Sequence, residues 1–222
     1  MMQADSRPIS SAQSTVHADL EKLLRRHLAQ PLRKPFAAYN ERALASALAA
    51  HAAWNGAAPL ILDAGCGVGW STLHLARMFP QHFVIGVDQS ADRLARGKPA
   101  ELPANAVLVR ADLVDFWRLL ARAGVRLDHH YNLYPNPWPK IGHLARRWHG
   151  HAVFPVWREL GGLVECRSNW RIYIEEMALA LGWLAGVPVV AEPYQPEQTM
   201  TPFEQKYLAS GHALWRCRVQ LD

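Results

Sequence analysis

The sequence has few cysteines, and they do not form the spacing of a disulfide framework or a metal site. Cys66, Cys166 and Cys217 are far apart in the chain, odd in number, and outside any CxxC or Cys/His ligand pattern. Small secreted domains depend on paired cysteines, and structural zinc sites depend on closely spaced Cys and His ligands. We therefore expect a cytoplasmic protein without a metal ion.

Long hydrophobic runs are also missing. The longest, Ala43 to Trp54, contains His51 and is shorter than the ~20 residues that a membrane-spanning helix needs. The N-terminus lacks the charged-then-apolar pattern of a signal peptide, and the chain has no internal repeat. We expect no membrane contact and one main domain at residues 58–222, preceded by a helical N-terminal extension at residues 1–57.

Acidic residues are in the minority. The chain has 24 Lys and Arg against 19 Asp and Glu, which gives a formal net charge of +5. This excess favours anionic partners such as nucleic acid or phosphates, but many proteins are equally basic. Half of the 222 residues are hydrophobic, which is ample for a core.

Short apolar strands alternate with helical segments after residue 58, the pattern of a doubly wound, mostly parallel α/β sheet. Residues 1–14 are polar and predicted to be disordered. The predicted strands are 60–62, 83–87, 106–109, 127–134 and 163–167, with a closing pair at 187–191 and 213–219. The predicted helices are 16–28, 37–54, 70–78, 91–96, 113–123, 152–160 and 170–184.

A glycine-rich loop separates the first strand from its helix. It reads Asp63-Ala-Gly-Cys-Gly-Val-Gly69, and the second strand ends in Asp88. Glycine lets backbone approach a ligand closely, and an acid after the second strand can hold two ribose hydroxyls. The simpler alternatives are a turn or helix-dipole role for Asp63 and a turn role for Asp88. We interpret Cys66 in the loop as a small hydrophobic residue.

The loop and its two acids resemble the class I S-adenosylmethionine (SAM) methyltransferases. The resemblance implies a seven-stranded Rossmann-like sheet with SAM as cofactor. It implies that Gly65, Gly67 and Gly69 line the methionine and ribose, that Asp88 binds the ribose, and that Asp112 contacts the adenine. Asp63 would hold the ammonium group or the amides of the loop.

A stiff aromatic loop follows the fourth strand. Three prolines lie within Tyr134 to Lys140, so this stretch cannot be a helix or a central strand. With the residues behind it, P-N-P-W-P-K-I-G-H-L-A-R-R, it resembles the bacterial tRNA (guanine-N7)-methyltransferases. Downstream, Ser168-Asn169 stands where that family has Thr-Asp, and Thr201-Pro-Phe-Glu204-Gln matches its T-x-F-E-Q motif.

The resemblance implies methyl transfer to guanine N7 in tRNA or a related RNA. The implied substrate-binding residues are Trp138, Lys140, His143, Arg146, Arg147 and Thr201, and the implied catalytic residues are Asn136, Asn169 and Glu204. Guanine N7 has a free lone pair, so its methylation needs positioning and no general base. Basic side chains would hold phosphates, and Trp138 would stack on a base. The alternatives are a solvated charged loop, a core position for Trp138 and an exposed helix-start position for Glu204.

Asn136 and Asn169 depart from the aspartates of that family. A carboxylate accepts from N1–H and N2–H of guanine together, whereas an amide presents one acceptor and one donor. This difference leaves two alternatives open. One is a SAM- or RNA-binding homologue with little activity. The other is a methyltransferase for an exocyclic amine or a small molecule, because an amide complements the edge of adenine. The oligomeric state, monomer or homodimer, does not follow from the sequence.

Overall fold

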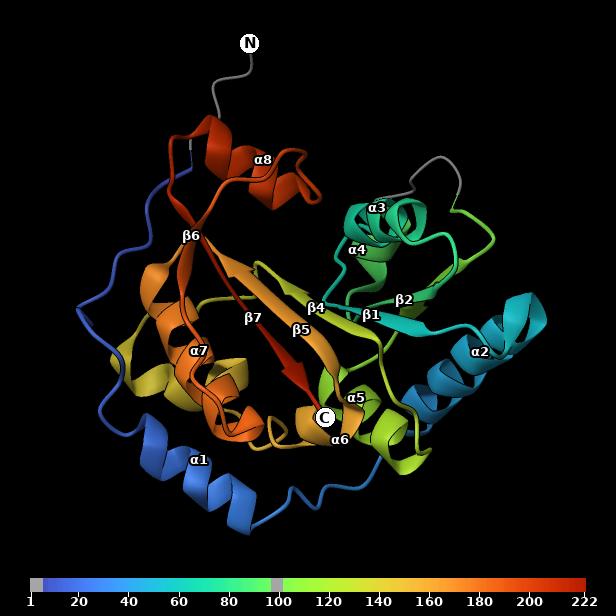
Figure 1. Cartoon of the computed structure of the whole chain (residues 1–222), viewed down its shortest axis with the longest axis horizontal. Coiled ribbons are helices and arrows are strands. Elements are labelled where there is room, and N and C mark those ends of the chain that lie inside the picture. Colours follow the sequence, from blue (N-terminus) through green and yellow to red (C-terminus); the bar gives the residue numbers. More distant parts are fainter. Residues whose placement is uncertain (1–5, 97–101) are drawn as a thin grey trace.

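The computed structural model describes residues 6–96 and 102–222. A central sheet of seven strands has the order β3-β2-β1-β4-β5-β7-β6, with β7 antiparallel to its two neighbours and the rest parallel. The strands are β1 Leu60–Ala64, β2 Phe83–Asp88, β3 Ala106–Arg110, β4 His129–Leu133, β5 Gly162–Ser168, β6 Glu192–Tyr194 and β7 Leu214–Leu221. The predicted doubly wound, mostly parallel sheet is confirmed (Figure 1).

Helices cover both faces of the sheet. The helices are α1 Leu20–Ala29, α2 Ala38–Asn55, α3 Trp70–Met78, α4 Ala91–Arg96, α5 Leu113–Arg122, α6 Val156–Leu160, α7 Arg171–Ala185 and α8 Pro202–Ala209. Strand residues alternate between two apolar clusters: Leu60 and Leu62 join the large one, whereas Ile61 joins a smaller one with Leu75 of α3. This period of two is what burial on both faces of a strand requires.

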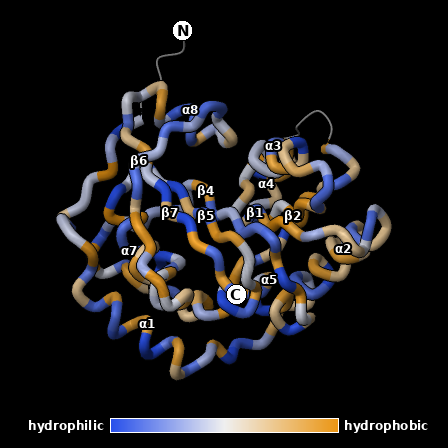
Figure 2. The backbone as a smooth tube through the Cα atoms, in the orientation of Figure 1, coloured by the Kyte–Doolittle hydropathy of each residue, from blue (hydrophilic) through white to orange (hydrophobic). Residues whose placement is uncertain are grey.

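The N-terminal helices belong to the same large core. Leu20 and Leu24 of α1, with Leu44 and Ala47 of α2, are buried in the cluster that covers one face of the sheet. Figure 2 shows α1 alternating hydrophilic and hydrophobic turns, as expected of a helix with one face on the protein. The boundary at residue 57 stays a prediction, but α1 and α2 are packed parts of the core. Among the described residues, no helix has the length and apolar character to cross a membrane.

Four local predictions are corrected. Residues 6–14, expected to be disordered, run along the surface and hydrogen-bond to distant segments; residues 1–5 lie outside the described part. The expected strand at 187–191 forms instead at Glu192–Tyr194, which pairs with β7 at the edge of the sheet. The expected helix at 152–160 is α-helical only from Val156. Finally, α8 is missing from the predicted helices, although the alternative for Glu204 implied a helix start and Thr201-Pro202 is a typical N-cap followed by proline.

Candidate active site

A cavity of about 460 Å³ opens at the carboxyl ends of the central parallel strands. Ligand sites of open α/β sheets lie at this edge, and cofactor sites typically have volumes of about 300–1,000 Å³. The glycine loop, Asp88 of β2 and Asp112 before α5 form one side of the cavity. The proline loop (Tyr134 to Lys140) and the start of α8 form the other side. The lining residues used below are Gly65, Gly67, Asp88, Asp112, Tyr134, Asn136, Trp148, Thr201 and Phe203. The cavity thus joins the two halves that the sequence predicts.

The glycine loop exposes its backbone to the cavity. Gly65 and Gly67 have φ angles of +83° and +59°, which L residues with side chains rarely adopt. A Cβ atom added to Gly67 would meet nothing within 4 Å, so this stretch of backbone is open to a ligand. Gly69 differs, because its Cβ would lie 2.7 Å from Cδ1 of Leu108 and the residue is not in the cavity wall. Gly69 therefore allows close packing at the start of α3, and its contact with the cofactor stays a prediction.

Asp88 lies at the end of β2 with its carboxylate against the glycine loop. Its Oδ2 accepts a hydrogen bond from the Gly67 amide at 3.0 Å, and its Oδ1 accepts one from the Ser90 amide at 2.8 Å. Arg93 Nη1 lies 3.6 Å from Oδ2. Each carboxylate oxygen can accept more than one hydrogen bond, so Asp88 can hold the loop and still accept from a ligand hydroxyl.

Asp112 caps the following helix at the same cavity. It is the N-cap of α5 and accepts a hydrogen bond from the Val114 amide at 2.8 Å. Its own amide donates to Oδ1 of Asn40 in α2 at 2.9 Å. Asp112 therefore lines the cavity from a fixed position, where the resemblance places the adenine contact.

Asp63 does not reach the cavity. Its Oδ2 accepts hydrogen bonds from the Ser71 hydroxyl at 2.6 Å and the Thr72 hydroxyl at 2.7 Å, both in the first turn of α3. Burial raises the pKa of Asp63 to about 6, against the two hydroxyl bonds that lower it. The prediction that Asp63 holds an ammonium group or the loop amides is corrected: it ties β1 to α3. Burial likewise raises the pKa of the Cys66 thiol, which agrees with its interpretation as a small hydrophobic residue.

The proline loop carries two residues with unusual backbone angles. Tyr134 and Trp138 have φ angles of +52° and +46°, and such conformations are strained for residues with bulky side chains. The Tyr134 hydroxyl donates a hydrogen bond to Glu204 Oε1 at 2.7 Å, which anchors the loop to α8. Between them, Asn136 is exposed and lines the cavity, with its Oδ1 3.4 Å from the Trp138 amide that donates to it.

Glu204 is fully buried, which corrects both sequence interpretations of it. Besides Tyr134, its carboxylate accepts from the Arg167 guanidinium at 3.1 Å and from the Met200 amide at 2.7 Å. Thr201 Oγ1 accepts from the Glu204 amide at 3.0 Å and caps α8. Glu204 therefore lies at the start of a helix, as the alternative expected, but it is buried there and is not directed at a base; it positions the wall of the cavity.

The basic run that follows the prolines, Lys140 to Arg147, ends in two arginines that face opposite ways. Arg146 is exposed, with its guanidinium 4.8 Å from the centre of the half-buried Trp138 ring. Arg147 is fully buried and forms an ion pair with Glu176 at 2.6 Å. The predicted contact of Arg147 with phosphate is corrected, because no surface of this side chain is left for RNA.

The remaining predicted residues surround the cavity entrance or lie apart from it. Lys140 is exposed, and the half-buried His143 packs edge-on against Trp138 with ring centres 5.6 Å apart. Asn169 is not in the cavity wall, and its Nδ2 lies 3.0 Å from Nδ1 of His212. The structure therefore does not bring Asn169 to the cavity with Asn136.

Two aromatic residues of the cavity wall were missed by the sequence analysis. Trp148 comes from the 3-10 turn after the basic run, and Phe203 from the first turn of α8, where its side chain is half exposed. Phe203 lies inside the T-x-F-E-Q motif, which was the available signal. Trp148 directly follows the basic run and had no signal of its own.

The strand order, the antiparallel β7 and the open glycine loop beside Asp88 define a Rossmann-like SAM-dependent methyltransferase. Solved structures with this fold include an antibiotic-related methyltransferase, with a TM-score of 0.54 and 15% identity over 85% of this chain and 96% of that one. A variant of the 16S rRNA (adenine(1408)-N(1))-methyltransferase from Catenulisporales acidiphilia, solved with SAM, has a TM-score of 0.53 and 21% identity over 85% and 93% of the chains.

The sequence places the protein within this class. The model of the family described as "Putative methyltransferase" matches residues 57–217. The tRNA (guanine-N(7)-)-methyltransferase of Paracidovorax citrulli is 31% identical over 182 residues, 76% of this chain and 71% of that protein. The enzyme of the same name from Acidovorax sp. is 29% identical over 184 residues, 76% and 70% of the two chains. The chain belongs to this methyltransferase family.

Proposed function

We propose that the protein transfers the methyl group of SAM to N7 of a guanine in tRNA. The observation that carries the proposal is the single cavity in which the glycine loop faces the proline loop and the start of α8. A methyl donor and a base held on these two sides meet without leaving the cavity. The names of the relatives support tRNA as the substrate, and the three unpaired, buried cysteines support a cytoplasmic location.

The residues on the cofactor side fit SAM. Bound there, SAM supplies an electrophilic methyl group on a sulfonium centre. The open backbone at Gly67 leaves room for the amino-acid and ribose parts, and the Asp88 carboxylate can accept from ribose hydroxyls. Asp112, held by its cap at α5, faces the same cavity farther along the sheet edge.

The side of the cavity formed by the proline loop and the start of α8, here called the base side, is aromatic and does not contain the basic side chains of the proline loop. Trp148 and Phe203 offer ring faces for a flipped or single-stranded base, a contact typically worth about 1–3 kcal/mol per base. Lys140 and Arg146 lie outside the cavity wall, where they can bind phosphates.

Asn136 is the residue that bears most directly on the identity of the base. It is the exposed polar side chain of the proline loop at the cavity. Its amide can accept one guanine N–H but presents its NH₂ to the second, which lowers the rate without preventing transfer. The same amide matches the donor–acceptor edge of adenine, so methylation of an exocyclic amine is the second function that this residue favours.

The test is transfer from labelled SAM to tRNA, followed by reduction and chain cleavage at 7-methylguanosine. We expect cleavage with the wild-type protein. N136D should raise the rate about tenfold, corresponding to about 1.4 kcal/mol. N169D is the matched control, an identical substitution outside the cavity wall, and should change the rate less than N136D.

Three results would count against the proposal. Label in a nucleoside other than 7-methylguanosine would favour the exocyclic-amine reaction. Binding of SAM without transfer to any RNA would identify a binding homologue of little activity. An equal response to N136D and N169D would contradict the assignment of Asn136 to the base side.

A further inference from the structure

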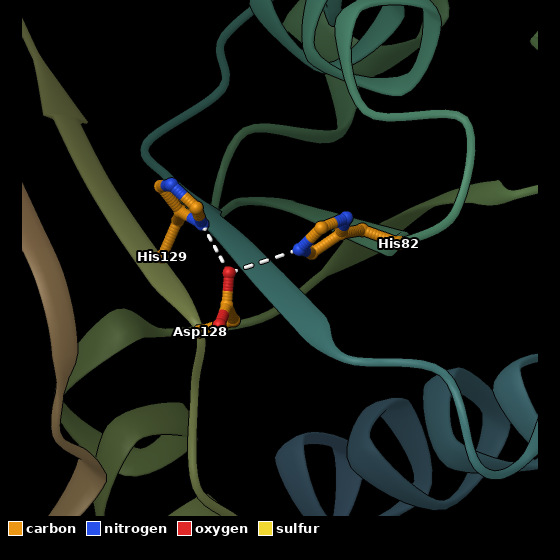
Figure 3. Close-up of side chains that lie close together, drawn as sticks. All are labelled: His82, Asp128 and His129. Atoms are coloured by element: carbon orange, nitrogen blue, oxygen red, sulfur yellow. Dashed lines mark hydrogen bonds and ion pairs between the residues drawn. The ribbon is translucent and has the colours of Figure 1, made fainter.

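We propose that His82, Asp128 and His129 form a binding site for a divalent zinc-like cation, remote from the methyltransferase cavity. Figure 3 shows the two imidazole rings and the carboxylate pointing toward one another. His82 Nε2, Asp128 Oδ2 and His129 Nδ1 all lie within 4.8 Å of one another. Two imidazole nitrogens and one carboxylate oxygen are a donor set typical of Zn²⁺ with an open position for water.

The distances suit a tetrahedral ion after a small adjustment. His82 Nε2 lies 2.9 Å and His129 Nδ1 2.6 Å from the same oxygen, Asp128 Oδ2. Zinc bonds of about 2.0–2.1 Å place neighbouring ligand atoms roughly 3.3 Å apart in a tetrahedral site. Both distances from Asp128 Oδ2 are shorter than this value, so small side-chain rotations that move the carboxylate away from the two rings bring the atoms to it.

The unpaired nitrogen of His129 is the observation that points to a ligand. Nδ1 of His129 is buried and has no hydrogen-bond partner among the described residues, although Asp128 Oδ2 is close. The contact therefore has the distance of an ion pair without the geometry of a hydrogen bond. A buried polar nitrogen without a partner is costly. A cation held between the nitrogen and the carboxylate removes that cost.

The backbone holds the three side chains in place before any ion binds. Strand β1 lies between β2 and β4, and both neighbours are fixed to its first residues. The amide of Phe83, next to His82, donates to the Pro59 carbonyl at 2.9 Å, and the Asp128 amide donates to the Leu60 carbonyl at 2.8 Å. His129 is in register with Ile61. An ion bound here links β2 to β4 across the end of β1.

Aromatic rings also limit the movement of the two imidazoles. The ring centre of Phe79 is 4.8 Å from that of His129 and 5.3 Å from that of His82. Tyr131 stacks on His129 with ring centres 5.9 Å apart. The side chains of His82 and His129 are only 20% and 16% exposed, whereas Asp128 is 47% exposed. The rings are thus held, and the carboxylate side remains open for entry of an ion.

The cluster lies at the amino ends of the parallel strands, and the methyltransferase cavity lies at their carboxyl ends. The two sites are therefore separate, and the inference does not depend on the proposed reaction. Local spacing of Cys and His predicts no metal, but this site has no local pattern, because His82 is distant in sequence from Asp128 and His129. The ion would stabilise the fold by binding only the folded chain.

The test is titration of the full-length, untagged protein with Zn²⁺ by calorimetry and with Co²⁺ by visible absorption. We expect one ion per chain, intense tetrahedral Co²⁺ bands and a rise of a few degrees in the melting temperature. H82Q, D128N and H129Q should each weaken binding at least tenfold. H17Q, at a histidine outside the cluster, should bind as the wild type does.

A measurement on the unaltered protein covers the case in which a variant fails to fold. Zinc should shift the ring ¹⁵N resonances of His82 and His129 together at one equivalent, and leave those of the other histidines in place. The proposal is overturned by an absence of saturable binding. It is also overturned if folded ligand variants bind like H17Q, or if zinc shifts other histidines at the same concentration.

Discussion

Replacing Arg147 by methionine tests whether this arginine is structural. The side chain is fully buried, and besides Glu176 it donates to the Gln13 side chain at 2.9 Å and to the Trp138 carbonyl at 3.2 and 3.1 Å. R147M keeps most of the volume but removes the arginine charge. The Glu176 carboxylate then keeps the His149 imidazole at 2.8 Å, and burial lowers the pKa of that imidazole. Removal of one partner from a buried ion pair typically costs about 3–5 kcal/mol.

The pKa of Glu176 gives a second estimate of the stability that R147M should lose. Burial alone would raise this pKa, but hydrogen bonds and charge from His149 and Arg147 outweigh it and lower the pKa from 4.5 to about 2. That difference corresponds to about 3 kcal/mol of stability. That value includes the contribution of His149, which remains in the variant, so we expect R147M to lose no more than about 3 kcal/mol, the lower end of the range. At roughly 2–4 °C per kcal/mol, the melting temperature should fall by at most about 6–12 °C.

The direction of the Glu176 pKa shift determines how the stability of the fold depends on pH. A carboxylate with a lowered folded pKa contributes stability that is present above its unfolded pKa of 4.5 and is lost as the pH falls toward 2. R147M should therefore show a shallower loss of stability over this window than the wild type. Thermal unfolding followed by circular dichroism at several pH values measures both effects.

Arg146 provides the matched control, one residue away and exposed. R146M should leave the melting temperature near the wild-type value and reduce the slope of log affinity for tRNA against log salt by about one unit. R147M should lower stability, and its folded fraction should keep the wild-type salt slope. Equal melting temperatures for the two variants, with equal losses of salt slope, would refute the structural assignment of Arg147.

Two further substitutions test the anchors of the cavity. Because burial raises the pKa of Asp63 to about 6, the wild type loses stability as the pH rises from 3.8 to 6. In urea unfolding, D63N should remove about 3 kcal/mol of that pH dependence. In calorimetry, it should bind SAM with little change. An unchanged pH dependence would contradict the assignment of Asp63 as a buried tie between β1 and α3. Y134F removes the hydrogen bond to Glu204, so it should cost about 1.5–3 kcal/mol and lower kcat more than it changes KM for SAM. An unaltered kcat would show that this anchor does not position the loop.

The sequence predicts the fold well because its strongest signals are local. Apolar runs, the glycine loop and acids at strand ends recur with the spacing of a parallel sheet, and each needs only a few adjacent residues to be recognised. The bounds of α3 and the start of α4 agree with the prediction. The strand at the sheet edge was misplaced, since Val187 and Val190 are exposed and apolar character there does not report burial.

The errors at the site concern the direction in which a side chain points. Adjacent arginines in a basic run look equivalent in the sequence, and only the distant Glu176 decides that Arg147 turns inward. Glu204 likewise lies in a recognised motif, but its partner Arg167 comes from β5. Long-range pairs of this kind leave no local pattern in a single sequence, so the chemistry of a residue can be predicted more easily than its orientation.

The hydrogen bonds of Gln13 have a consequence for the order of folding during synthesis. Gln13 contacts Glu176, 163 residues later in the chain, and it also accepts from Arg147. The ribosome makes Gln13 near the start and Glu176 only after the whole proline loop has emerged, at about 5–20 residues per second. The loop that faces the base must therefore wait for α7 before its support is complete. Until then a nascent chain presents the Arg147 charge without its Glu176 partner, which makes this interval the period in which a chaperone or a protease has access to it.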